Sequence, residues 1–296
     1  MTAPSSGIKL LILVLSFEGE PFSKIQMQGQ DSTFIGRALE ISSVIRYVGR
    51  HFSLPPKYRL IFALRKLQYA LLDFSQIFFV GRVLRLVTDL RFGDRDIQRV
   101  PTFGGNADIE EVPYQVSTYG EVSRLITKSP EDWSLIGLKT IQALRHVLDK
   151  YDFDFVFRTN TSSYLDVDLL KDYLTKLPKN RVYGGVVGKV FHDTEFASGA
   201  GILLSRDMVE LICENSESWK HGLVDDVAIA EIIKEFALPV VPITPLPRLD
   251  LPTLDAAQAT DNETIRNNFH FRCKSSSADE TIKIMRYIHE VKRLTL

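Results

Sequence analysis

Hydrophobic and polar positions along this chain alternate between runs typical of strands and runs typical of helices. The strand-like runs are short and either apolar or alternating with a period of two; they are Lys9–Ser16, Val44–Val48, Phe155–Arg158, Val182–Val187, Gly201–Ser205 and Val240–Ile243. The helix-like runs have apolar residues three and four positions apart; they are Ser134–Lys150, Asp168–Leu177, Arg206–Asn215, Asp225–Phe236 and Ala278–Lys292. This alternation predicts an α/β fold with a mixed, mostly parallel central sheet and helices on both of its faces.

The segment 53–96 has a different pattern. Leu60, Leu64, Leu67 and Leu71 recur at helical intervals with basic residues between them. We therefore predict a basic helical insertion within a single domain that spans residues 1–296. Periodicity alone does not distinguish a helix pair that caps the core from a pair that lies on an anionic membrane surface.

Charge is concentrated in the same part of the chain. From Ile35 to Val100 there are 12 Arg or Lys against 5 Asp or Glu, whereas the rest of the chain has 24 basic and 32 acidic residues. A basic segment in an otherwise acidic chain predicts an anionic partner surface. The overall composition, 45% hydrophobic and 25% charged, excludes a disordered or fibrous protein.

The sequence predicts neither a membrane span nor a secretory leader. The apolar run Ile8–Leu15 is too short to cross a bilayer, and Phe17-Glu18-Gly19-Glu20 follows it in place of a cleavage site. Cys213 and Cys273 lie far apart and form neither a disulfide framework nor a metal-ligand spacing. We expect a cytoplasmic protein, with peripheral contact at the inner face of a membrane as an added possibility through the basic insertion.

The most informative run extends from Asp152 to Asp168. Three phenylalanines alternate with other residues as the chain enters a strand, and six polar residues follow, Arg158-Thr159-Asn160-Thr161-Ser162-Ser163. The carboxyl ends of strands line the ligand crevice in α/β folds, so this exit is a candidate binding site. A surface turn rich in Ser and Thr gives the same pattern. Asp152-Phe153-Asp154 has the form of a D-x-D metal motif, but it lies at the entry of the strand and is rejected.

Two further segments have candidate chemistry. In Phe196-Ala197-Ser198-Gly199-Ala200-Gly201, small residues allow the backbone to approach a ligand or a neighbouring element closely, although the spacing is not a dinucleotide-binding G-x-G-x-x-G. Val224-Asp225-Asp226-Val227 opens an amphipathic helix with two carboxylates. Helix capping accounts for one of them, which leaves the other for general-base catalysis.

In this order and spacing, these segments resemble the β-1,3-galactosyltransferase and fringe group of glycosyltransferases, which has the GT-A fold. The matching runs are Leu138-Lys139-Thr140, Phe155-Val156-Phe157-Arg158-Thr159, Val182-Tyr183-Gly184-Gly185, Ser198-Gly199-Ala200-Gly201 and Asp225-Asp226-Val227. The resemblance extends over residues 123–238. It implies a Rossmann-like nucleotide-sugar-binding domain that transfers a hexose from a nucleotide-sugar donor to a hydroxyl group of a glycan or lipid-linked acceptor.

The chain departs from this family at the metal site. The family has an acidic triplet whose divalent cation neutralises the donor diphosphate, whereas this chain has Asn160-Thr161-Ser162. Hard cations prefer carboxylate ligands, so dependence on Mn²⁺ or Mg²⁺ stays open. His270 resembles by position a histidine that completes the metal site in such enzymes, and a core histidine between Phe269 and Phe271 is the equal alternative.

The resemblance also implies roles for individual residues. Asp226 would deprotonate the acceptor in an inverting transfer, and Asp225 would cap the helix or hold the acceptor. The residues expected to shape the sugar or acceptor pocket are Ser198, Gly199, Ala200 and Gly201. The residues expected to bind the donor are Ser16, Phe17, Glu18, Lys139, Arg158, Thr159, Asn160, Thr161, Ser162, Arg272 and Lys274.

Three alternative functions stay open. One is a retaining transferase on the same fold, and another is a non-catalytic nucleotide-sugar- or glycan-binding protein. The third is a nucleic-acid binder that uses the basic insertion. Aromatic and basic residues there have helical spacing, which suits a core face better than a base-stacking platform, so no nucleic-acid partner is predicted.

Overall fold

The computed structural model describes residues 7–51, 108–116, 120–132, 135–189, 194–221 and 223–294. The predicted basic insertion 53–96, and with it the predicted membrane contact, lies outside the described residues. Within those residues, no helix combines the length and the apolar character needed to span a bilayer.

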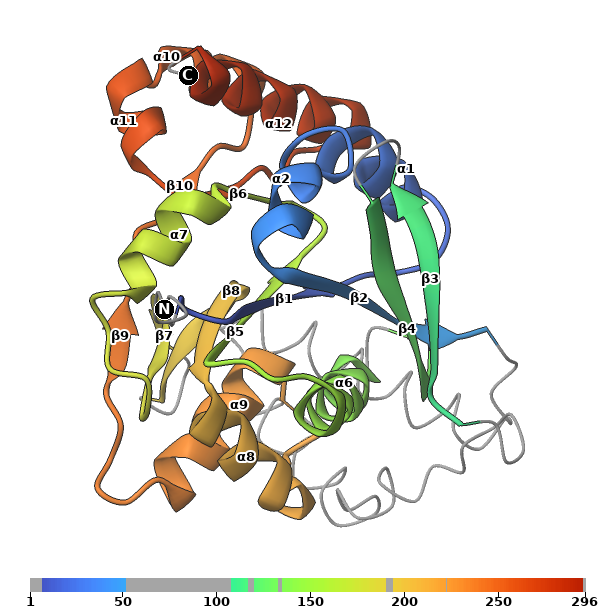
Figure 1. Ribbon diagram of the computed structural model, residues 1–296, viewed down its shortest axis with the longest axis vertical. Helices are drawn as coiled ribbons and strands as arrows, with labels where there is room; N and C mark the ends of the chain where they lie inside the picture. The colour runs from blue at the N-terminus through green and yellow to red at the C-terminus, as the bar shows by residue number, and fades with distance from the viewer. Residues whose placement is uncertain are drawn as a thin grey trace, which may run out of the picture.

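The centre of the described fold is a mixed sheet of eight strands in the order β3-β4-β2-β1-β5-β8-β7-β9 (Figure 1). The strands are β1 (Leu10–Leu15), β2 (Ser43–Arg50), β3 (Glu110–Val116), β4 (Gly120–Pro130), β5 (Phe155–Asn160), β7 (Tyr183–Lys189), β8 (Glu195–Ser205) and β9 (Ile243–Pro245). Of the seven strand pairs in this described sheet, four are parallel. The predicted α/β class with a mixed sheet is therefore confirmed.

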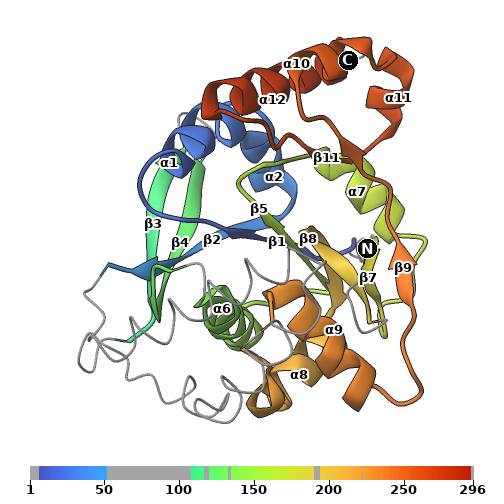
Figure 2. The same cartoon turned by 180° about the vertical axis from the view of Figure 1, so that it is seen from behind.

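Helices cover both faces of this sheet (Figures 1 and 2). One face packs against α6 (Ile136–Lys150), α8 (Arg206–Glu214) and α9 (Asp225–Phe236). The other packs against α2 (Phe34–Ile41), α7 (Val167–Leu174) and α12 (Ala278–Arg293). Alternate residues of β1 enter the two cores, because successive side chains of a strand point to opposite faces. All six residues of β1 are buried, as expected for a central parallel strand.

A smaller sheet lies beyond the carboxyl end of β5. Within the described residues it has three strands, β10 (Leu249–Asp250), β11 (His270–Arg272) and β6 (Ser163–Leu165). Only two residues separate β6 from β5, so the small sheet is attached directly at the polar exit of that strand. The short helices α10 (Leu254–Ala259) and α11 (Asn262–Asn267) connect β10 to β11, and β11 leads into α12.

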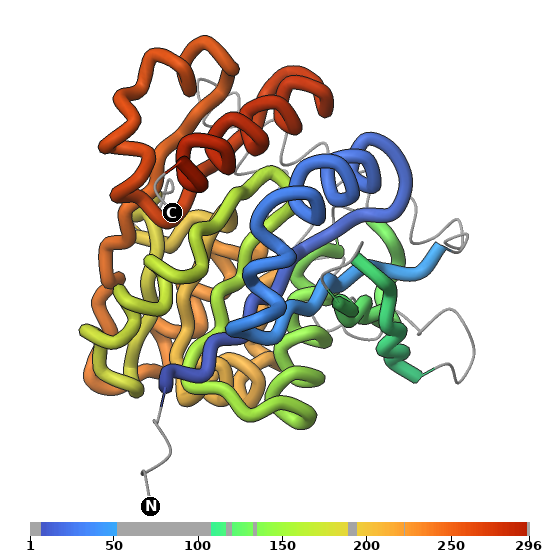
Figure 3. Tube along the Cα trace, turned by 45° about the horizontal axis from the view of Figure 1, so that its top comes forward, coloured from blue at the N-terminus to red at the C-terminus, as the bar shows by residue number. Residues whose placement is uncertain are grey.

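Segments from early and late in the chain pack against each other. The helical turns α1 (Phe22–Ile25) and η1 (Gln26–Gln30) lie against α12, which follows more than 240 residues later (Figure 3). A further short turn, η3 (Ser216–Ser218), follows α8.

Most predicted elements agree with the structure to within a few residues, and the bounds of α9 are confirmed. Two expectations are corrected. The strand predicted at Gly201–Ser205 begins earlier, because the small-residue segment 196–201 is the first half of β8, which pairs with β5 and β7. The last predicted strand, Val240–Ile243, begins later, as β9.

Candidate active site

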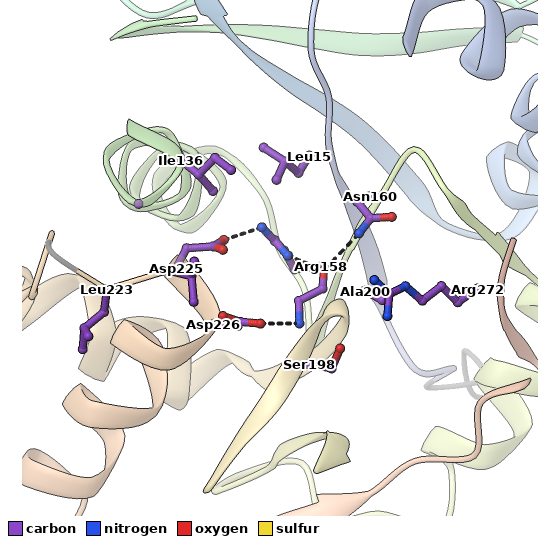
Figure 4. A pocket seen from close by; sticks show the side chains of 13 residues that line it. Leu15, Ile136, Arg158, Asn160, Ser198, Ala200, Leu223, Asp225, Asp226 and Arg272 are labelled. Atoms are coloured by element: carbon purple, nitrogen blue, oxygen red, sulfur yellow. Dashed lines mark hydrogen bonds and ion pairs between the residues drawn. The ribbon is translucent and has the colours of Figure 1, made fainter. Parts of the chain in front are cut away.

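A cavity of about 420 Å³ lies at the carboxyl ends of β1 and β5, a size typical of small-molecule sites. Its lining residues are Leu15, Ile136, Gly137, Arg158, Asn160, Ser198, Gly199, Ala200, Leu223, Val224, Asp225, Asp226 and Arg272 (Figure 4). The sheet continues from β1 to β2 and β4 on one side and to β5 on the other. The cavity therefore lies where the strand order reverses, which is where open α/β sheets bind ligands.

Asp225 is the buried counter-ion of Arg158. The Arg158 side chain is 2% exposed, and its Nη2 donates to Oδ2 of Asp225, while Thr140 Oγ1 donates to the same oxygen at 3.1 Å. The other Arg158 nitrogens donate to the Tyr47 hydroxyl at 3.1 Å and to the Gly199 carbonyl. Arg158 is thus not the free phosphate ligand that we predicted, because a cation this deeply buried requires a partner of opposite charge.

The predicted capping role of Asp225 is also corrected. The N-cap of α9 is Val224, and no side chain caps this helix. The Asp225 carboxylate turns instead toward Arg158 and Thr140. Asp225 also lines the cavity, so its role in holding the acceptor stays a prediction.

Asp226 points into the cavity and has the properties of a general base. Its Oδ2 accepts from the Gly199 N–H at 2.8 Å, and its Oδ1 accepts from the Val227 N–H at 2.9 Å. Burial, followed by repulsion from Asp225, raises the pKa of Asp226 to about 6, against the opposing effect of the Gly199 N–H and the Arg158 charge. A carboxylate with a pKa near neutrality is matched to proton transfer in the physiological range.

Because the pKa of Asp226 is raised, the difference in stability between the wild type and Asp226→Asn should depend on pH. The folded-state pKa of about 6 lies above the ordinary 3.8, so the folded protein holds the proton more tightly than the unfolded chain. As the pH rises from about 4 to above 6, the wild type should therefore lose stability relative to Asp226→Asn, by at most about 3 kcal/mol. Urea unfolding of both proteins at pH 4 and pH 7.5 measures the change. An unchanged difference at the two pH values would show that the Asp226 pKa is not raised.

The polar stretch at the end of β5 mainly holds its own turn together. Asn160 Oδ1 accepts from the Ser162 N–H at 3.1 Å, the Ser162 hydroxyl at 2.8 Å and the Ser163 hydroxyl at 3.3 Å. Thr159 Oγ1 donates to the Ala200 carbonyl at 2.7 Å, and Thr161 is buried. Of the predicted donor-binding residues 159–162, only Asn160 lines the cavity.

The oxygen atoms available as metal ligands at the carboxyl end of β5 do not suit the divalent cation that the resemblance implies. The Asn160 side-chain oxygen already accepts three hydrogen bonds, and Asp225 is paired with Arg158, which leaves Asp226 as a single carboxylate of the lining for a cation. Among the described residues, no three His, Cys, Asp or Glu side chains come together as a possible metal site. A hard cation would therefore find no charged oxygen cage here.

His270, the predicted metal ligand, is a core residue in the structure. Its side chain is buried edge-on against Phe157, with ring centroids 5.4 Å apart. Burial, followed by the charge of Arg248, lowers the pKa of His270 to about 3, so the ring is neutral. The nearby charges of Arg248 and Arg272 also oppose a metal ion at this position.

Lys139 does not reach the cavity either. Its side chain is fully buried, with Nζ 3.1 Å from Glu131 Oε1 and 3.4 Å from the Ser16 carbonyl, and it lies 3.8 Å above the centre of the Phe17 ring. Burial lowers the pKa of Lys139. These contacts fix the segment after β1 to α6, so Lys139 has a structural role in place of the predicted phosphate contact.

The remaining predicted donor-binding residues lie outside the cavity lining. Ser16 and Phe17 take part in the Lys139 cluster, and Glu18 pairs with Arg124 and with His51 at 2.9 Å. Lys274 is exposed. Arg272 is the predicted donor-binding cation that lines the cavity without a described acidic partner.

The small residues of β8 divide into two groups. Ser198, Gly199 and Ala200 line the cavity, as predicted. Gly201 does not: a Cβ atom there would lie 2.3 Å from the His270 ring, so this glycine is required for packing and not for a pocket.

Sequence reasoning missed the apolar wall and the support beneath the site. Leu15, Ile136 and Leu223 line the cavity, but nothing in the hydrophobic pattern separates them from core residues. Gln30 is fully buried, and its amide donates to the carbonyls of Asn160 at 3.1 Å and Ser163 at 3.0 Å. It thereby holds the turn between β5 and β6.

Replacing Gln30 by Leu should destabilise the protein by about 1–3 kcal/mol, because two buried carbonyls lose their donor and Arg46 loses an acceptor at 3.1 Å. Denaturant unfolding measures this loss. Gln28→Leu is the matched control: Gln28 is exposed on the same helical turn, and its replacement should change stability by less than about 0.5 kcal/mol. If the two substitutions lower the free energy of unfolding equally, Gln30 does not support the turn.

Comparisons with known proteins add nothing to these observations on the site. No protein-family model matches this chain, and no curated protein matches it.

Proposed function

We propose that this protein transfers a sugar from a nucleotide-sugar donor to a hydroxyl group of a glycan or lipid-linked acceptor, with inversion at the anomeric carbon. The observation that carries the proposal is Asp226, a carboxylate with a pKa of about 6 in the cavity where β1 and β5 end. The geometry and the pKa together are those of a general base at a ligand site.

The convergence of the family-like motifs supports a GT-A-like interpretation of the fold. Asn160 at the exit of β5, Ser198 to Ala200 in β8 and the acidic pair that opens α9 are far apart in sequence, yet all of them line the same cavity. The small sheet that follows β5 provides a second wall through Arg272.

The proposed reaction needs one proton transfer and one displacement. The Asp226 carboxylate takes the proton of the acceptor hydroxyl as the acceptor oxygen forms a bond to the anomeric carbon. The bond from that carbon to the phosphate oxygen breaks, and its electron pair leaves with the nucleoside diphosphate. The Gly199 N–H fixes the orientation of Asp226, whose oxygens keep further lone pairs for the proton.

The site favours inversion over retention. A double displacement needs a nucleophile that is free to attack the anomeric carbon, as well as a group that moves the proton. Asp225, the second carboxylate of the cavity, already accepts from Arg158 and Thr140. A single displacement assisted by Asp226 is therefore the simpler route.

A thermal-shift panel of nucleotide sugars tests the proposal. One member should raise the melting temperature, because a ligand at 100 times its Kd stabilises the folded state by about 2.7 kcal/mol. The matching free sugars serve as controls and should have no effect at the same concentration. If no nucleotide sugar shifts the transition, the proposed function is wrong.

A further inference from the structure

We propose that Arg272 binds the diphosphate of the donor and takes the place of a divalent cation, so that donor binding does not depend on a metal ion. This inference rests on the proposed function and concerns the leaving-group side of the same cavity.

Arg272 differs from the other arginines at the site. Within the described part of the chain, its side chain makes no ion pair or hydrogen bond, and its Nε is buried without a partner. Figure 4 shows its guanidinium end turned toward Asn160 and Arg158, into the cavity. Arg158, by contrast, already donates to Asp225, Tyr47 and Gly199.

The acidic residue that lies opposite Arg272 in the small sheet is paired with a different arginine. Asp250 of β10 is the register partner of Arg272 in β11, but both of its carboxylate oxygens accept from Arg248, at 2.5 and 2.9 Å. Arg248 also donates to the Ser198 hydroxyl at 3.0 Å, which places a second guanidinium directly behind a cavity-lining residue. Because Arg248 and Asp250 neutralise each other, Arg272 is the cation that the small sheet presents to the cavity.

The charges that line the cavity favour an anion on this wall. Arg158 and Asp225 neutralise each other, which leaves Asp226 and Arg272 as the opposed charges of the lining. Figure 4 shows these two side chains reaching the cavity from opposite sides, Asp226 from α9 and Arg272 from β11. An in-line displacement requires this arrangement, since the base and the leaving group must lie on opposite faces of the anomeric carbon.

A guanidinium can perform the task that a cation performs in the family. Its planar array of N–H groups donates two parallel hydrogen bonds to phosphate oxygens. The diphosphate gains one negative charge as its bond to the sugar breaks, so the interaction with Arg272 strengthens in the transition state.

Isothermal titration calorimetry with UDP, GDP, CDP and TDP, in EDTA and in MnCl₂, tests this inference. One nucleoside diphosphate should bind with a Kd that changes less than about threefold between the two buffers. If a bridging cation held the diphosphate, its removal by EDTA would raise the Kd far more than this. Arg272→Gln should weaken that binding by about 10- to 100-fold. Lys283→Gln is the matched control: it removes an exposed cation of α12 outside the cavity lining and should leave the Kd unchanged.

The outcomes separate the inference from the proposed function. Binding that requires Mn²⁺ and is unaffected by Arg272→Gln overturns the inference and leaves sugar transfer standing. Absence of binding by every nucleoside diphosphate in both buffers overturns the proposed function, and the inference with it. If Arg272→Gln fails to show a cooperative thermal transition, Arg272→Lys replaces it. Lys keeps the charge without the fork, so affinity should fall by about 3- to 10-fold, and unchanged affinity would contradict the inference.

Discussion

Replacing Asp226 by Asn should lower kcat/KM for sugar transfer by about 10²–10⁴-fold, because the variant cannot accept the acceptor proton. The amide keeps the size of the side chain and can still accept from the Gly199 N–H, so donor binding should be retained. Steady-state kinetics and calorimetry on the same preparation separate the two effects. In the wild type, kcat/KM should also fall as the pH drops below about 6, since protonated Asp226 is inactive as a base.

The control for this variant is Glu235→Gln, which removes an exposed carboxylate from the same helix without touching the cavity. Its kinetics should match the wild type. Full turnover by Asp226→Asn would show that another group is the base. A wild type that binds a nucleotide sugar but never consumes it would be the non-catalytic protein that the sequence also allows.

Replacing Arg158 by Met should lower the free energy of unfolding by about 3–5 kcal/mol, because it leaves Asp225 buried without its counter-ion. Denaturant unfolding at pH 7 measures the loss. The double variant Arg158→Met/Asp225→Asn removes both charges and should recover most of it.

Arg37→Met provides the comparison for an exposed pair. Arg37 contacts Asp168 and Glu40, and all three side chains are at least half exposed. Its removal should cost less than about 1 kcal/mol. An equally small effect of Arg158→Met would contradict the structural role given to the Arg158–Asp225 pair.

The elements around the site could be predicted from the sequence because long apolar runs fix them. The period of two along β5 and the helical spacing in α9 specify which positions are buried, and the bounds of α9 follow from its spacing. The strands of the small sheet are a different case. β6, β10 and β11 have two or three residues each, too few for a periodic pattern, so the sequence alone did not predict the wall that bears Arg272.

The roles of the charged residues could not be read from the sequence. Arg158, Lys139 and Arg272 are alike in the sequence as candidate phosphate ligands, and only their contacts in the folded protein distinguish them. Arg158 pairs with a residue 67 positions away, and the two buried cations are neutralised within the protein. Likewise, the polar exit of β5 predicted a binding loop, whereas its side chains mostly satisfy backbone groups that a tight turn leaves unpaired.

The most direct test of inverting sugar transfer is proton NMR of the anomeric signal while the wild-type protein is incubated with the nucleotide sugar that stabilises it and with a set of glycan and lipid-linked acceptors. We predict that the donor signal decays and that the released or transferred sugar first appears with the opposite anomeric configuration. Initial product with the donor's configuration, or a donor signal that never decays, would contradict this prediction.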